Sequence, residues 1–203
     1  MSCRHYTAIA LLLLAGIVAT PTANAQAFCA LRDPTSQIYR LYPQATSYRS
    51  IVRSVDANAR ARLAAELPFS IHSREVGKHT LYLALRDGVP LGLVHVRSEP
   101  SDWGLVEIAW SIGLDMRISG FAFQRCRGRG CPDVESVDFQ TLLQHRNLDG
   151  ARALLTPAAD HLSAALAWHD PASERLAVTV ARSAVKTLAI TDLIWGPELV
   201  ALR

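Results

Sequence analysis

Hydrophobic and polar residues alternate along the middle of the chain, which predicts β-strands there. Leu81, Leu83 and Leu85 alternate with other residues, and Asp87-Gly88 follows them as a hairpin turn. A return strand is predicted over residues 91–97, a third strand over 106–114 and a fourth over 117–125. These strands share one apolar face, so we expect an antiparallel sheet that needs a covering layer.

Helical spacing of apolar residues predicts the covering layer on both sides of this region. The predicted helices run from Asp33-Pro34 to Leu41, from Asp56 to Leu67, from Asp138 to Gln144, from Thr156-Pro157 to Leu166, and from Asp170-Pro171 towards Ile194, where Gly196-Pro197 should stop the last one. The prediction is an α+β fold with a central antiparallel sheet of four or five strands, covered by N-terminal and C-terminal helices.

The first 25 residues have the pattern of an export signal. Arg4 precedes an apolar run from Ala8 to Ala19, and Ala23-Asn24-Ala25 provides a small-x-small cleavage site. The run is shorter than the roughly 20 apolar residues of a membrane-spanning helix. We therefore predict a signal peptide over 1–25 and one domain over 26–203, in the periplasm or otherwise outside the cytoplasm. Membrane contact is expected only if the segment is retained as an anchor.

Composition narrows the function class further. The chain has 21 Lys and Arg against 18 Asp and Glu, a formal net charge of +3, and 50% hydrophobic residues. This balance is typical of a packed globular protein. Without a basic tract, the sequence gives no reason to expect nucleic acid as a partner.

Three cysteines remain after the predicted signal, namely Cys29, Cys126 and Cys131. Cys126 and Cys131 bracket a short Gly-containing loop, and such a loop can close as a disulfide in an oxidising compartment. The alternatives are a structural Cys126–Cys131 bridge with a buried Cys29, a redox-active dithiol, and a bridge from Cys29 to one of the other two.

Common catalytic motifs are absent from the sequence. It contains no Gly-x-Ser-x-Gly elbow, Walker loop or His-Glu-x-x-His pair. His79 and His95 fall on adjacent predicted strands, where they are either structural histidines or metal ligands. We interpret Glu107 as a solvated strand residue, and Trp103 and Trp110 as core or rim aromatics. An electron-transfer or binding protein is expected rather than a stand-alone enzyme.

Two segments, in this order, resemble the FMN-binding domain of the extracytoplasmic flavin subunits of bacterial ion-pumping electron-transport complexes. Gly113-Leu114-Asp115, followed by Ile118 and Gly120, is similar to the strand-turn-strand motif of that family. Residues 177–185 are similar to its attachment segment, with matches at Thr179, Val180, Ala184 and Val185. The attachment motif is degenerate, because Ala177-Val178 replaces the family's Gly-Ala and Ala181 replaces its second Thr.

The resemblance implies FMN bound through a phosphoester at Thr179, with Gly113 and Asp115 in a turn that approaches the flavin. Arg175, Arg182 and Lys186 recur with Thr179 along one helix stripe, which is either a set of phosphate partners or a solvated face. The implied function is an exported FMN-binding protein in electron transfer, partnering a membrane or envelope redox protein. The alternatives are a cofactor-free binding or assembly module on the same scaffold, and a thiol redox protein that uses Cys126 and Cys131.

Overall fold

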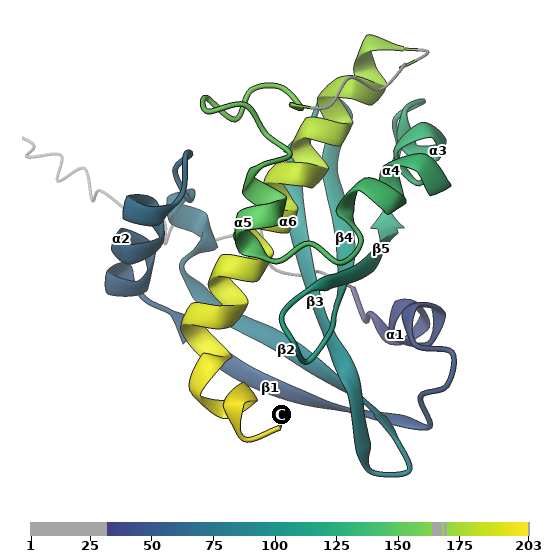
Figure 1. Ribbon diagram of the computed structural model, residues 1–203, viewed down its shortest axis with the longest axis vertical. Helices are drawn as coiled ribbons and strands as arrows, with labels where there is room; N and C mark the ends of the chain where they lie inside the picture. Colours follow the sequence, from purple (N-terminus) through teal and green to yellow (C-terminus); the bar gives the residue numbers. More distant parts are fainter. Residues whose placement is uncertain (1–31, 164–167, 169, 203) are drawn as a thin grey trace, which may run out of the picture.

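The structure is a computed structural model in which residues 32–163, 168 and 170–202 are described. The predicted signal segment and Cys29 lie outside the described residues. A five-stranded antiparallel sheet follows the chain in the order β1-β2-β3-β4-β5 (Figure 1). Its strands are β1 (Ser47–Val55), β2 (Gly77–Arg86), β3 (Val89–Ser101), β4 (Gly104–Ile112) and β5 (Ile118–Arg125).

The helices are placed around this sheet. They are α1 (Thr35–Leu41), α2 (Ala57–Glu66), α3 (Cys131–Val134), α4 (Val137–Leu143), α5 (Leu148–Arg152) and α6 (Pro171–Val200), with a 3-10 turn η1 (Ser73–Glu75). The predicted α+β class, with helices before and after a central antiparallel sheet, is confirmed. None of the described helices is long and apolar enough to be a candidate membrane span.

One face of the sheet is covered by α6, which runs along the length of the molecule (Figure 1). Trp110 and Trp195 are fully buried in this layer. The indole nitrogen of Trp110 donates to Ser183 Oγ at 3.2 Å, and that of Trp195 donates to the Ile51 carbonyl at 3.3 Å. These bonds satisfy the only polar atoms of two large core side chains and fix α6 across the strands.

The opposite face is also covered, so the prediction of a sheet with one apolar face is wrong. Ile38 of α1 packs into a second buried cluster with Ala84, Val94, Val96 and Ala109. Next to it, the hydroxyl of Tyr42 lies 3.0 Å from the Ile112 carbonyl. The central strands β3 and β4 are therefore buried on both faces.

The predicted Asp87-Gly88 hairpin turn is present. Asp87 and Gly88, with φ of 51° and 82°, connect β2 to β3 where Arg86 pairs with Val89. The fifth strand, β1, was not predicted. It is an edge strand with residues such as Arg49, Val52 and Arg53 exposed, so its sequence lacks the alternation that burial of one face produces.

Two helix predictions are wrong. Residues 157–163 are not helical, because Thr156 Oγ1 donates to Asp160 at 2.7 Å and the chain turns back to pair Leu155 with Leu162. The last helix does not stop at Gly196-Pro197 but continues to Val200. A proline in the last turn removes only one helical hydrogen bond, and the buried side chains of Trp195 and Leu199 hold that turn against the core.

Candidate functional site

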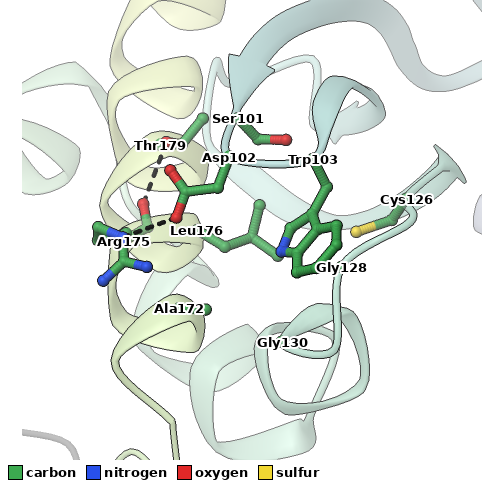
Figure 2. A pocket seen from close by; sticks show the side chains of 10 residues that line it. All are labelled: Ser101, Asp102, Trp103, Cys126, Gly128, Gly130, Ala172, Arg175, Leu176 and Thr179. Atoms are coloured by element: carbon green, nitrogen blue, oxygen red, sulfur yellow. Dashed lines mark hydrogen bonds and ion pairs between the residues drawn. The ribbon is translucent and has the colours of Figure 1, made fainter.

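Thr179 lies between two hollows at the end of the molecule where β3 turns into β4. The smaller has a volume of about 20 Å³ and is shown in Figure 2. Its lining consists of Ser101, Asp102, Trp103, Cys126, Gly128, Gly130, Ala172, Arg175, Leu176 and Thr179. The larger has a volume of about 210 Å³ and is lined by Ser70, His72, Glu75, Glu99, Pro100, Thr179, Arg182 and Lys186.

Thr179 is the residue shared by both hollows. The residue is half-buried and lies more than two turns inside α6, which begins at Pro171. Its Oγ1 donates to the Arg175 carbonyl at 3.1 Å. Because the backbone N–H at this depth is part of the helical ladder, the side chain and not a helix N-terminus would have to hold a ligand here.

Arg175 lies one turn before Thr179 and is already paired. Its Nε is 2.7 Å from Asp102 Oδ2, across the smaller hollow from the β3–β4 turn (Figure 2). Both side chains are about half exposed, so the pair adds little stability. It does reduce the positive charge that Arg175 presents to the hollow.

Arg182 lies one turn after Thr179 and faces the larger hollow. Its guanidinium carbon lies 4.8 Å from the centre of the Phe69 ring, a cation–π contact. Among the described residues, no carboxylate pairs with it and no acceptor takes a hydrogen bond from it. Its donors are therefore available for an anion in the same hollow as the Thr179 hydroxyl.

Lys186, the third cation of the predicted stripe, is buried in an ion cluster. Its Nζ lies 2.6 Å from Glu99 Oε2 and 3.2 Å from Glu75 Oε1. Arg97 completes the cluster by pairing with both carboxylates. Burial alone would raise the pKa of Glu75, but the charges of Arg97 and Lys186 outweigh it and hold that pKa below its ordinary value.

The cluster balances its own charges. Two carboxylates face two cations, and the three donors of Lys186 are matched by contacts to Glu75 and Glu99. Lys186 therefore forms the floor of the larger hollow without presenting a free donor to it.

His79 and His95 lie beside this cluster, and neither has the surroundings of a metal ligand. Their ring centres are 6.1 Å apart, edge to face. His79 Nε2 is 2.8 Å from the Glu75 carbonyl, and His95 Nδ1 is 2.9 Å from Thr191 Oγ1. In the described part of the chain, no group of three His, Cys, Asp or Glu residues is placed to hold a metal ion.

Gly113 and Asp115 are not brought together with Thr179. They lie in the β4–β5 turn, whereas Thr179 lies near the β3–β4 turn, and about 30 Å of extended strand separates these two turns at 3.3 Å per residue. Asp115 Oδ1 accepts from the Arg117 N–H at 3.2 Å. A Cβ at position 113 would lie 2.4 Å from that oxygen, so a larger residue there would displace the exposed Asp115 side chain.

The predicted Cys126–Cys131 disulfide is present, with a Cα–Cα distance of 6.0 Å. Its loop packs between the β3–β4 turn and the first turn of α6. A Cβ on Gly128 would lie 2.8 Å from the Trp103 ring, and one on Gly130 would lie 2.7 Å from the Ser173 Cα. These two glycines let the loop approach both neighbours closely.

Sequence reasoning missed or misplaced several of these side chains. Glu107 is fully buried, not solvated, because α1 covers its face of the sheet. Arg32 and Arg125 lie 3.7 and 3.8 Å from its carboxylate. The two tryptophans, by contrast, were interpreted correctly as core or rim aromatics, since Trp110 is in the core and Trp103 is 59% exposed beside the disulfide loop. The ion cluster gave no local signal, because Glu75 and Lys186 are 111 positions apart.

Comparison with known proteins gives a limited result. No family model matches the chain, and no curated relative matches it. Among solved structures, the crystal structure of NqrC from Shewanella oneidensis matches with 14% identity, covering 82% of this chain and 87% of that one, at a TM-score of 0.49. The function is therefore argued from the site.

Proposed function

We propose that the protein binds FMN at Thr179 and takes part in electron transfer outside the cytoplasm. The observation that carries the proposal is that Thr179 and Arg182 line the same hollow of about 210 Å³, where the Arg182 guanidinium has no carboxylate partner among the described residues. A guanidinium with available donors is the group that best complements a phosphate. FMN is proposed as the ligand because the segment around Thr179 resembles an FMN-attachment segment.

The hollow suits one end of FMN. Its volume is below the 300–1,000 Å³ that is usual for enclosed ligand sites. It would hold the phosphate between Thr179 and Arg182, and the ring system would extend beyond it. A ligand held by one end dissociates easily, and a phosphoester at Thr179 would prevent its loss from an exported protein.

The remaining residues of the predicted set have secondary parts in this proposal. Arg175 would add charge beside the phosphate to the extent that Asp102 releases it. Lys186 would position the floor of the hollow through Glu75 and Glu99. Gly113 and Asp115 would shape the β4–β5 turn, away from Thr179. The bound flavin would accept and donate the electrons.

The second candidate function is a cofactor-free binding or assembly module. It is favoured by the pairing of Arg175 and Lys186 with carboxylates, which leaves Arg182 as the available cation beside Thr179. It also agrees with the helix interior position of Thr179, where backbone donors are used.

An absorption spectrum and an intact mass separate the two functions. For protein purified from the envelope of its native host, we expect a flavin spectrum and a mass gain of one FMN less water, both lost in Thr179→Ala. Thr141→Ala is the matched control, because Thr141 is also a helical threonine whose hydroxyl donates to the carbonyl four residues earlier. If the protein is colourless, has the mass of the polypeptide alone and takes up no added FMN, the FMN-binding proposal is rejected. The cofactor-free binding module then remains as the function.

The role of Arg182 has its own measurement. In Thr179→Ala protein, which cannot form the ester, Arg182→Gln should weaken the binding of added FMN about tenfold or more, the usual cost of removing a charged hydrogen-bond partner. Arg62→Gln is the control, since Arg62 is exposed on α2. If Arg182→Gln and Arg62→Gln have the same affinity for FMN, Arg182 does not bind the phosphate.

A further inference from the structure

The Cys126–Cys131 loop is held in place by contacts that do not need the disulfide. Gly128 packs under the Trp103 ring, and Gly130 packs against the backbone of Ser173. Ser173 Oγ also donates to Asp133 Oδ2 at 2.7 Å, which ties the residues after the loop to the first turn of α6. The loop therefore has packing partners on both sides and a hydrogen bond at its end.

As a staple, the disulfide adds little to this arrangement. It joins residues five positions apart. A cross-link stabilises a fold less when the loop that it closes is shorter, and this loop is very short. Opening the bridge would leave the sheet, α6 and the loop contacts in place.

The two cysteines also lie where a reagent can reach them. Cys126 lines the smaller hollow together with Arg175 and Thr179, and its side chain is drawn there in Figure 2. Both cysteines are partly exposed, and the exposed residues Arg127 and Arg129 lie between them in the chain. Nearby guanidinium groups stabilise a thiolate and make it a better leaving group.

We propose that Cys126–Cys131 is a reversible dithiol–disulfide couple that opens into the hollow beside Thr179 and exchanges electrons with dithiols. A thiolate of the substrate attacks Cys126 Sγ, the Cys126–Cys131 bond breaks, and Cys131 leaves as a thiolate. The second thiol of the substrate, as its thiolate, then attacks the mixed disulfide and releases Cys126. The substrate dithiol is oxidised to a disulfide by loss of two electrons and two protons, and the protein gains two thiols.

This couple is independent of the proposed flavin, since neither step involves a cofactor. The two proposals can therefore fail separately. Protein without flavin can still exchange its disulfide, and flavin-loaded protein can still carry an inert one.

The test is reduction of the folded protein by dithiothreitol, followed by alkylation and peptide mapping of Cys126 and Cys131. We expect both cysteines to be alkylated without denaturant, at a rate proportional to dithiothreitol concentration, while the far-UV circular dichroism stays native. Oxidised glutathione should restore the bridge. Peptide mapping separates these sites from Cys29.

A structural staple that the fold protects from reagents would behave differently. Its reduction would require urea concentrations that unfold the protein, or its rate would level off at the rate of unfolding as dithiothreitol increases. Either result overturns the proposal. The double variant Arg127→Gln/Arg129→Gln tests the leaving-group argument, and we expect reduction about threefold slower than in the Arg62→Gln control. Unchanged kinetics in the double variant would contradict the assignment of Cys131 as a stabilised leaving thiolate.

Discussion

Lys186 Nζ on α6 lies 2.6 Å from Glu99 Oε2 on β3, and both side chains are almost completely buried. This contact joins the helix that carries Thr179 to the strand that leads into the β3–β4 turn. The floor of the larger hollow is therefore an ion cluster and not an apolar layer. Such a cluster fixes the relative position of helix and strand only while every charge keeps its partner.

We predict that Lys186→Met lowers the free energy of unfolding by about 3–5 kcal/mol, because it leaves Glu75 and Glu99 buried with Arg97 alone. Urea denaturation measures this loss. The double variant Lys186→Met/Glu99→Leu removes one charge of each sign and should be more stable than the single variant. A loss below about 1 kcal/mol in Lys186→Met would show that the cluster is hydrated.

We predict that the folding stability depends on pH because of His79, the buried histidine next to this cluster. Burial, reinforced by the charge of Arg97, lowers the pKa of His79 from 6.5 to about 4. Between these values the unfolded chain binds a proton that the folded protein does not, so folding stability is fully present above pH 6.5 and decreases as the pH falls towards 4.

The full shift corresponds to about 3 kcal/mol. Urea denaturation between pH 7.5 and pH 4 measures it. His79→Gln should be less sensitive to pH over that interval than the unmodified protein. The remaining dependence would arise from His95, whose pKa burial also lowers, and near pH 4 from Glu75, whose pKa Arg97 and Lys186 hold down. The same slope in both proteins would show that His79 does not carry the effect.

The third prediction concerns the close packing of the disulfide loop against α6. Gly130→Ala places a methyl group 2.7 Å from the Cα of Ser173, and backbone at that position can move only with the helix. We expect a loss of about 1–3 kcal/mol. Gly120→Ala is the control, since its nearest neighbour is the side-chain oxygen of Gln140 at 3.5 Å. Equal unfolding midpoints in the two variants would contradict close packing at Gly130.

The sequence predicted those parts of the fold that local patterns determine. Alternating leucines and the Asp87-Gly88 turn fix the β2–β3 hairpin, and Asp170-Pro171 fixes the start of α6. The edge strand β1 was missed because most of its side chains are exposed and only a few pack on either face, so its sequence does not alternate. Glu107 was misplaced because its burial depends on α1, about seventy residues away in the chain.

The candidate site was predictable only in part, for the same reason. Helical spacing placed Arg175, Thr179 and Arg182 on one stripe of α6. It could not show that Asp102 from the β3–β4 turn would pair with Arg175, or that Glu75 and Glu99 would pair with Lys186. Spacing gives the face of a helix, whereas the partners of that face come from strands far away in the chain.

The Asp102–Arg175 pair leads to the last prediction. Its 2.7 Å contact competes with any phosphate that Thr179 and Arg182 hold. In Thr179→Ala protein, the further substitution Asp102→Asn should therefore raise the affinity for FMN about fivefold, because an exposed ion pair is worth up to about 1 kcal/mol. Quenching of flavin fluorescence at low ionic strength measures the affinity. Adding Arg175→Gln to Asp102→Asn should abolish the gain. An equal gain in both proteins would show that Asp102 repels the phosphate directly and that Arg175 has no part in binding it.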